Sequence, residues 1–160
     1  MAEVIIDTNV LAVAEGMHAS ASDSCRAACV GLLKRVEEGT VVVADTGDLI
    51  LSQYVQAMEA ANTAGIGVKL AKRLWRERNG GIVCRQVEIT QSEAPESGFG
   101  EVPEILQDFD DDDLMFVAVA RADPENSPLY QALDEQWWER RNDFLAGGVD
   151  LQFLCSPDLL

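Results

Sequence analysis

Short apolar runs alternate with amphipathic stretches along most of the sequence, and this alternation constrains the fold more than any other feature. Candidate strands, most of them rich in Val and Ile, fall at 4–6, 40–44, 82–89, 128–133 and 149–155. A continuous apolar run bounded by turn-forming residues suits a strand that is covered on both faces. Strands that alternate with helices predict an α/β fold, a three-layer α/β/α sandwich around a central parallel sheet of four to five strands.

The segments between the candidate strands place apolar residues at three- and four-residue intervals, as amphipathic helices do. The clearest of these helices begins at the capping pair Ser22-Asp23 and ends near Gly39. Other candidate helices follow Asp48, run from about 66 to 78, follow Asp110–Asp113, and span 135–147. The chain has 160 residues, of which 48% are hydrophobic and 25% charged, so we expect a single globular domain over 1–160.

The sequence is strongly acidic, with a formal net charge of -16. Such a surface repels phosphate backbones, so a nucleic-acid ligand would have to be met by a local basic region. One candidate lies on a single face of the helix expected over 66–78 and consists of Lys69, Lys72, Arg73 and Arg76. We assign these four residues to contact with a phosphate backbone, and a plain solvated face is the alternative.

Nothing near the N-terminus predicts export, since Met1–Asp7 has no basic region and reaches an acid after three apolar residues. No apolar run is long enough to span a bilayer, and we expect a cytoplasmic protein that does not bind membranes. The sequence contains one histidine, His18, and four cysteines, Cys25, Cys29, Cys84 and Cys155. The cysteines form no Cys-x-x-Cys pair, so we expect four buried apolar side chains rather than a zinc site or a disulfide.

Three aspartates fall at comparable positions in this pattern of strands and helices. Asp7 follows the first strand, Asp113 begins a helix, and Asp134 follows the fourth strand. Ligands of open parallel sheets bind beyond the carboxyl ends of the strands, where these residues would meet. Carboxylates that are forced together repel one another unless protons or a cation neutralise them. Mg²⁺ or Mn²⁺ suits oxygen ligands and retains water that can attack a phosphodiester, although each aspartate alone could be a turn former or a helix cap.

Four segments resemble the motifs of PIN domains and occur in the same order. They are Val4–Leu11 (VIIDTNVL), Phe109–Ala120 (FDDDDLMFVAVA), Ala132–Trp137 (ALDEQW) and the closing Leu154–Pro157 (LCSP). The resemblance covers nearly the whole chain and implies a single PIN-like domain that acts as a metal-dependent endoribonuclease, either a toxin or an RNA-processing enzyme. It implies Asp7, Asp113 and Asp134 as catalytic metal ligands for Mg²⁺ or Mn²⁺, with Asn9 as a supporting group. RNA is then the expected substrate, and an antitoxin, another protein or a second copy of the chain is the expected partner.

The sequence departs from the PIN pattern at two positions. The family usually places a glutamate in the helix after the second strand, and this chain has Gln53 there; it has Gln136 where relatives often have a further aspartate. An amide offers an oxygen but no negative charge, so metal affinity should fall. The departures favour, as an alternative, a catalytically weakened PIN-like binding or scaffold module, unless Asp45 or Asp48 compensates.

A third hypothesis treats Asp7 as a nucleophile that accepts a phosphoryl group, as in haloacid-dehalogenase-like hydrolases and receiver domains. Haloacid-dehalogenase-like hydrolases place a second aspartate two positions after the first, and this chain has Asn9 there. We therefore rank phosphoryl transfer last among the three hypotheses.

Overall fold

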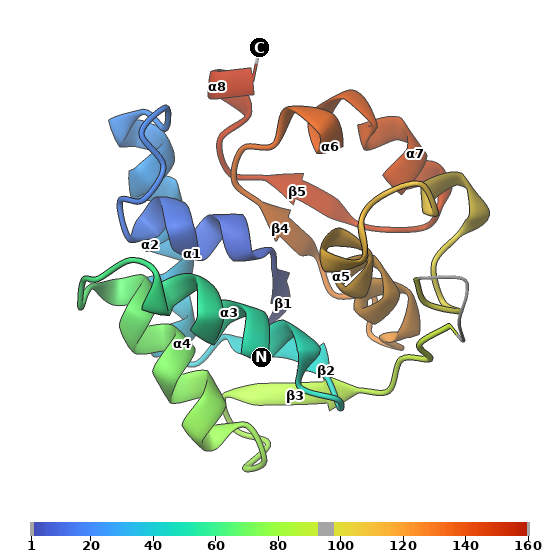
Figure 1. Cartoon of the computed structure of the whole chain (residues 1–160), viewed down its shortest axis with the longest axis horizontal. Coiled ribbons are helices and arrows are strands. Elements are labelled where there is room, and N and C mark those ends of the chain that lie inside the picture. The colour runs from blue at the N-terminus through green and yellow to red at the C-terminus, as the bar shows by residue number, and fades with distance from the viewer. Residues whose placement is uncertain (1, 93–97, 160) are drawn as a thin grey trace.

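The computed structural model describes residues 2–92 and 98–159, and its centre is a five-stranded sheet in which all strands run parallel (Figure 1). The strands are β1 (Glu3–Ile6), β2 (Val41–Asp45), β3 (Cys84–Val87), β4 (Leu129–Gln131) and β5 (Leu151–Phe153). Their order in the sheet is β3-β2-β1-β4-β5. The predicted parallel sheet is confirmed, with the upper of the two expected strand numbers.

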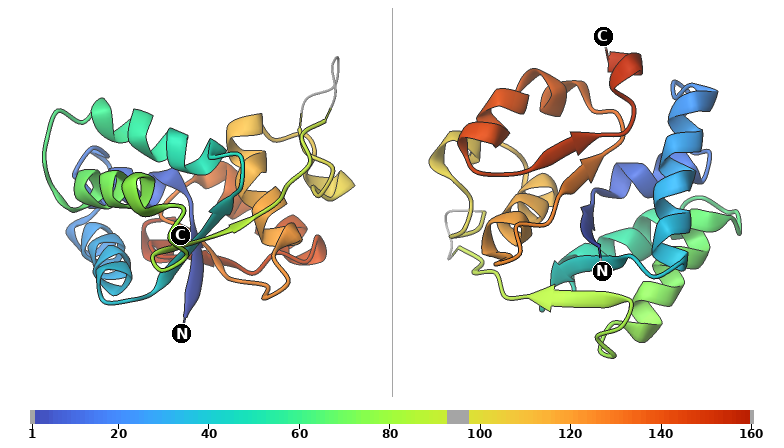
Figure 2. Two further views of the ribbon diagram at one scale, coloured as in Figure 1. Left: turned by 90° about the horizontal axis from the view of Figure 1, so that it is seen from below. Right: turned by 180° about the vertical axis from the view of Figure 1, so that it is seen from behind.

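Helices flank the sheet, which gives the expected three-layer α/β/α sandwich (Figure 2). The helices before β3 are α1 (Thr8–Ala14), α2 (Asp23–Glu37), α3 (Leu49–Glu59) and α4 (Ile66–Glu77). Those after β3 are the 3₁₀ turn η1 (Glu104–Leu106), α5 (Asp111–Ala122), α6 (Glu135–Glu139), α7 (Arg141–Ala146) and α8 (Ser156–Leu159). Within the described part of the chain, no helix is both long and apolar enough to cross a bilayer.

The middle strand β1 explains why the first apolar run lacks alternation. Val4, Ile5 and Ile6 are all buried, because β1 has a strand on each side and helical layers above and below. Val4 pairs with Val42 of β2, and Ile5 pairs with Leu129 of β4. From β1 the chain builds outward to β3 and then returns to β4 on the other side. This reversal beside β1 creates a switch point, the place at which open parallel sheets usually bind ligands.

The structure differs from the predicted elements in several places. Helices α1 and α8 were not predicted, and the helix expected over 135–147 is two helices joined at Arg140. The Arg140 guanidinium turns back to the carboxylates of Asp143 at 2.6 Å and Asp108 at 2.7 Å, which fixes the junction. Strands β3 and β5 are shorter than expected. Of the loop expected over 91–103, residues 93–97 lie outside the described residues.

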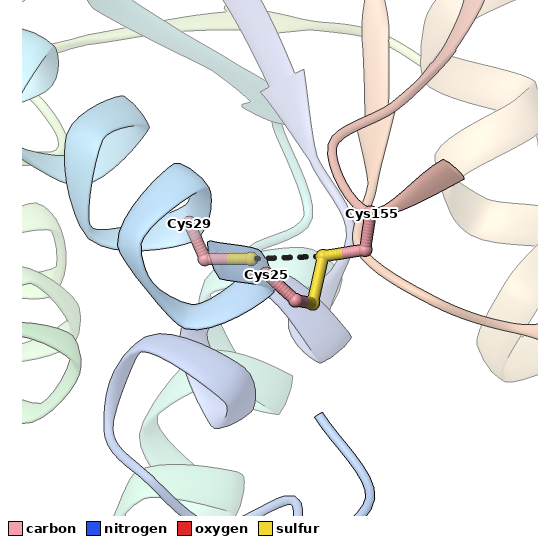
Figure 3. A group of neighbouring side chains, drawn as sticks. All are labelled: Cys25, Cys29 and Cys155. Carbon is pink, nitrogen blue, oxygen red and sulfur yellow. Dashed lines mark hydrogen bonds between the residues drawn. A yellow bond between two sulfur atoms is a disulfide. The ribbon is translucent and has the colours of Figure 1, made fainter. Parts of the chain in front are cut away.

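The cysteines correct the expectation of four unbonded side chains. Cys25 and Cys155 form a disulfide, with their Cα atoms 4.8 Å apart (Figure 3). Cys155 also lies in the turn after β5 rather than within a strand. The two bonded residues are separated by 130 positions, and the spacing of cysteines in a sequence says nothing about such a long-range approach. Cys29 and Cys84 are buried and unbonded, as expected.

Asp45 ends β2 as a fully buried carboxylate that holds the start of α3. Its two oxygens accept the backbone N–H groups of Leu49 and Ile50, each at 2.9 Å. An Asp45→Ala variant is expected to lose about 2–3 kcal/mol of unfolding free energy, because two backbone donors lose their partner. Urea denaturation measures this loss. Asp45→Asn keeps one acceptor, so its unfolding free energy should fall between those of the wild type and Asp45→Ala. If Asp45→Ala were as stable as the wild type, Asp45 would not be the group that holds the start of α3.

Candidate functional site

Asp7 lies directly after β1 and is almost completely buried, with 6% of its surface exposed. It caps α1, and its Oδ2 atom accepts the backbone N–H of Asn9 at 3.0 Å. Burial first, and then the nearby charges of Asp113 and Asp134, raise the pKa of Asp7 to about 7, against the hydrogen bonds from Asn9 and Gln131. Asp7 is therefore a carboxyl group that gives up its proton only near neutral pH. A cation close by would let it ionise at a lower pH.

Asp113 and Asp134 reach the same edge of the sheet from two helices. A helix that connects parallel strands runs against them, so its N-terminus lies at their carboxyl ends. Asp113 is in the first turn of α5, and Asp134 caps α6 by accepting the backbone N–H of Trp137 at 3.2 Å. Burial first, and then the charges of Asp134 and Asp110, raise the pKa of Asp113 to about 6.

These mutual effects join Asp7, Asp113 and Asp134 into one group, which we call the acidic cluster. All three offer oxygen ligands of the kind that Mg²⁺ and Mn²⁺ prefer. In the described part of the chain, however, the one group of three ligand atoms already gathered within 4.8 Å consists of cysteines, not of these aspartates. A cation at the acidic cluster would thus need rotation of a side chain, or water between the ion and one carboxylate, which suits the ordinary preference of Mg²⁺ for several waters.

Asn9 and Gln53 both lie beside the acidic cluster. The Oδ1 atom of Asn9 accepts the backbone N–H of Leu133 at 3.0 Å, which ties α1 to the segment that ends in Asp134. The Oε1 atom of Gln53 accepts the hydroxyl of Thr8, the residue after Asp7, at 3.0 Å. Gln53 therefore faces the region in which a further acid was expected. Gln136 is exposed.

Asp45 and Asp48 have other partners. Asp45 caps α3, as described above, and Asp48 contacts the guanidinium of Arg78 at 3.3 Å and the side-chain amide of Gln86 at 3.1 Å. These interactions hold the β2–α3 turn against β3 and its preceding loop. Both carboxylates therefore have partners of their own, and neither takes the place of the glutamate that the PIN pattern has at position 53.

Three neighbours of the acidic cluster were not predicted. Gln131, at the end of β4, is buried with 1% exposure and lowers the pKa of Asp7 by hydrogen bonding. The hydroxyl of Tyr54 donates to the backbone carbonyl of Ile6 and ties α3 to the end of β1. The side chain of Trp137 lowers the pKa of Asp113, yet its Nε1 makes no hydrogen bond of ordinary geometry among the described residues. We therefore treat the indole as a weak, poorly aligned donor to Asp113. The buried polar position of Gln131 within an apolar strand was the one available signal in the sequence.

A hollow of about 500 Å³ opens beside Asp134. Its lining includes Asn9, His18, Gln136 and Asp158. The single histidine, His18, thus lines this hollow. Its Nδ1 atom lies 3.0 Å from the hydroxyl of Ser20. The hollow gives a ligand of nucleotide size access to the edge of the acidic cluster.

The basic face of α4 lies away from the acidic cluster. Lys69, Lys72 and Arg76 are exposed, and Arg73 pairs with Glu77 at 3.3 Å. Helix α4 starts beside Glu15, at the far end of α1 from Asp7, and a helix of that length spans about 10 Å. Figure 1 shows α4 and α6 on opposite sides of the molecule. A ligand held by both regions would therefore have to extend along α1.

Glycine at position 67 explains how closely α4 approaches α1. A Cβ atom there would lie 2.8 Å from the backbone carbonyl oxygen of Leu11, which is closer than atoms of this kind pack. Only glycine fits the contact, and the approach lets the Glu15 carboxylate accept the backbone N–H groups of Gly65 at 2.8 Å and Val68 at 3.0 Å.

Comparison of the chain with protein-family models, with curated proteins and with solved structures found no match.

Proposed function

We propose that the protein is a PIN-like, metal-dependent endoribonuclease that acts in the cytoplasm, as a toxin or in RNA processing. The observation that supports this most is the buried carboxyl group of Asp7, whose pKa is raised to about 7 by burial and by two further aspartates at the same sheet edge. Keeping three acids together raises the free energy of the folded protein unless a cation compensates. A nuclease of this class uses such a cation.

In this proposal Mg²⁺ or Mn²⁺, held by the acidic cluster, would supply a Lewis acid and a water of lowered pKa. Asp7, Asp113 and Asp134 provide the negative charge that holds the ion. Asn9 fixes Asp7 through its backbone N–H and ties the Asp134 segment to α1 through its side chain. The RNA would enter along the hollow beside Asp134, with Lys69, Lys72, Arg73 and Arg76 meeting a more distant part of its backbone.

A cleavage assay tests the proposed activity. A fluorescently labelled single-stranded RNA and a structured RNA are incubated with the protein in Mg²⁺, in Mn²⁺ and in excess chelator. We expect cleavage in either metal ion, none in chelator, and recovery when the metal ion is restored. Cleavage that persists in chelator, or intact RNA under all conditions, would contradict a metal-dependent ribonuclease.

A second candidate function is a weakened module that binds RNA or protein without cutting. It is favoured by Gln53, an uncharged amide that accepts the hydroxyl of Thr8, the residue after Asp7. A Gln53→Glu variant is expected to bind Mn²⁺ at least about 10-fold more tightly, equivalent to about 1.4 kcal/mol, because it adds a carboxylate beside the acidic cluster. Isothermal titration calorimetry at fixed pH measures the difference.

Gln56→Glu is the matched control, because Gln56 is exposed on the same helix. It adds the same charge to α3 without facing Thr8, so its Mn²⁺ affinity should equal that of the wild type. Equal gains in both variants would point to a general charge effect, and no gain in Gln53→Glu would place position 53 outside the metal site. Gain of RNA cleavage in Gln53→Glu alone would identify the natural protein as the weakened form.

A further inference from the structure

Three buried cysteines gather where the C-terminal turn meets the start of α2 (Figure 3). Cys25 and Cys29 are one helical turn apart on α2 and project toward Cys155, which follows β5. The three sulfur atoms all lie within 4.8 Å of one another, and the Sγ atoms of Cys29 and Cys155 are 4.0 Å apart. We call this group the cysteine cluster. It shares no residue with the acidic cluster, and the proposed nuclease activity does not use it.

Hydrogen bonds hold the segments of the cysteine cluster in place independently of the disulfide. The N–H of Cys155 donates to the carbonyl of Ala132 at 3.2 Å, which fixes the turn against the end of β4. On the other side, Asp158 accepts the backbone N–H of Ser22 at 3.0 Å and its hydroxyl at 2.8 Å. Because the hydrogen bonds of Asp158 to Ser22 join the C-terminal turn to the start of α2, reduction of the disulfide should leave all three thiols near one another.

We propose that the reduced cysteine cluster is a binding site for a soft monovalent metal ion, Cu(I), with Cys25, Cys29 and Cys155 as three thiolate ligands. Metal–sulfur bonds of about 2.3 Å place the three sulfurs of a trigonal site about 4.0 Å apart. That spacing is the one observed between Cys29 and Cys155. Freed from their bond, Cys25 and Cys155 reach a similar spacing by rotation about their side-chain bonds.

The choice of Cu(I) over Zn²⁺ follows from the number of ligands. Structural zinc is almost always held by four ligands. Cu(I) is also selected by soft thiolate ligands. Within the described residues the group holds three cysteines and no fourth Cys, His, Asp or Glu. Burial of all three side chains also leaves little access for water as a fourth ligand.

The three thiols differ in how readily they form thiolates. Cys25 lies in the first turn of α2, where the positive end of the helix dipole stabilises a thiolate. Burial raises the pKa of Cys29 to about 12, so this thiol stays protonated until a metal ion displaces the proton. A dithiol supplies two electrons and two protons to the Cys25–Cys155 disulfide and itself closes to a disulfide. The three protein thiols then release three protons as Cu(I) binds.

A competition titration tests the site on the whole chain. The protein is reduced with dithiothreitol, desalted without oxygen, and titrated into the coloured Cu(I) complex of bicinchoninic acid. We expect the reduced protein to remove one equivalent of Cu(I) per chain, and X-ray absorption to show three sulfur neighbours. Failure to compete, or a ligand set without three sulfurs, would overturn the proposal, as would tighter retention of Zn²⁺ than of Cu(I) at the same site.

The oxidised wild-type protein provides a control that needs no substitution, because its disulfide leaves Cys29 as the one thiol of the cluster. It should bind Cu(I) at least about 100-fold more weakly, a larger loss than removal of an outer-shell partner produces. Reduced Cys29→Ser should show a similar loss, and reduced Cys84→Ser, altered at a buried cysteine of β3, should bind as the wild type does. Equal losses in both serine variants would contradict a site at the cysteine cluster, and circular dichroism checks that each variant is folded.

Discussion

An Asp7→Asn variant is expected to lose at least about 100-fold of the metal-dependent RNA cleavage, which exceeds the usual effect of removing a partner of a metal ligand. The substitution removes the charge of the most buried member of the acidic cluster but keeps an oxygen that can accept the N–H of Asn9. Asparagine caps helices about as well as aspartate, so α1 should remain intact. Initial rates of RNA cleavage in Mn²⁺, with equal amounts of folded protein, measure the loss.

Asp111→Asn is the matched control. Asp111 belongs to the same acidic run and begins α5, but its side chain is exposed. Both variants change the net charge by one, so general effects on RNA binding should be alike in the two. Cleavage in Asp111→Asn should therefore stay near that of the wild type. Equal activity in wild type and Asp7→Asn would sink the assignment of Asp7 as a metal ligand.

As the pH rises from about 4 to about 8, the metal-free wild type is expected to lose about 4 kcal/mol of unfolding free energy relative to Asp7→Asn. This figure is the shift in the pKa of Asp7 from 3.8 to about 7, converted to free energy. Between the two pKa values the folded protein keeps a proton on Asp7, whereas the unfolded chain has released it. The unfolding free energy of the wild type therefore falls as the pH rises, and it levels off above the folded pKa. Asp7→Asn has no such group and should lack this component.

Urea denaturation of both proteins in chelator across this pH range measures the difference. Acids remote from the acidic cluster titrate alike in the two proteins, so the subtraction leaves the contribution of Asp7 and of its coupling to Asp113 and Asp134. Addition of Mn²⁺ at the alkaline end should restore stability to the wild type and much less to Asp7→Asn, because an ion that binds the folded state stabilises it. Parallel pH profiles for the two proteins would show that Asp7 ionises in the folded protein as it does in water.

Most of the fold could be predicted because the sheet buries its middle strands completely. The continuous run Val4–Ile6 and the β-branched run of β2 have no polar alternation, as strands covered on both faces require. The capping pair Ser22-Asp23 marked the start of α2, and the structure confirms Ser22 as the cap that accepts the N–H of Cys25. The order of the strands could not be predicted, because pairings such as Ile5 with Leu129 join residues far apart in the sequence.

The elements that were missed are short or depend on tertiary contacts. Helix α1 has seven residues, about two turns, which is too short for apolar spacing alone to predict a helix. The end of α6 depends on the pairing of Arg140 with Asp108 and Asp143. The cap of α4 comes from Glu15, some 50 positions upstream. Local periodicity does not report contacts of this kind.

The approach of three aspartates to one sheet edge could be predicted, and their environment could not. Asp7, Asp113 and Asp134 stood out because each follows a strand or begins a helix at the same sheet edge, and the structure places their charges near one another. The depth of burial of Asp7 and the contribution of Gln131 depend on side-chain packing from β4. The disulfide between Cys25 and Cys155 likewise depends on the return of the C-terminal segment to α2.

The most direct test of the acidic cluster as a metal site is a crystal structure of the protein soaked in Mn²⁺, with anomalous scattering used to locate the ion. Asp7, Asp113 and Asp134 should surround one strong anomalous peak, with at least two of the carboxylates bound directly and the remaining contact direct or through water. The crystals are soaked at the Mn²⁺ concentration used in the RNA cleavage assay. If they diffract well yet show no peak between these three side chains, the acidic cluster is not a metal site.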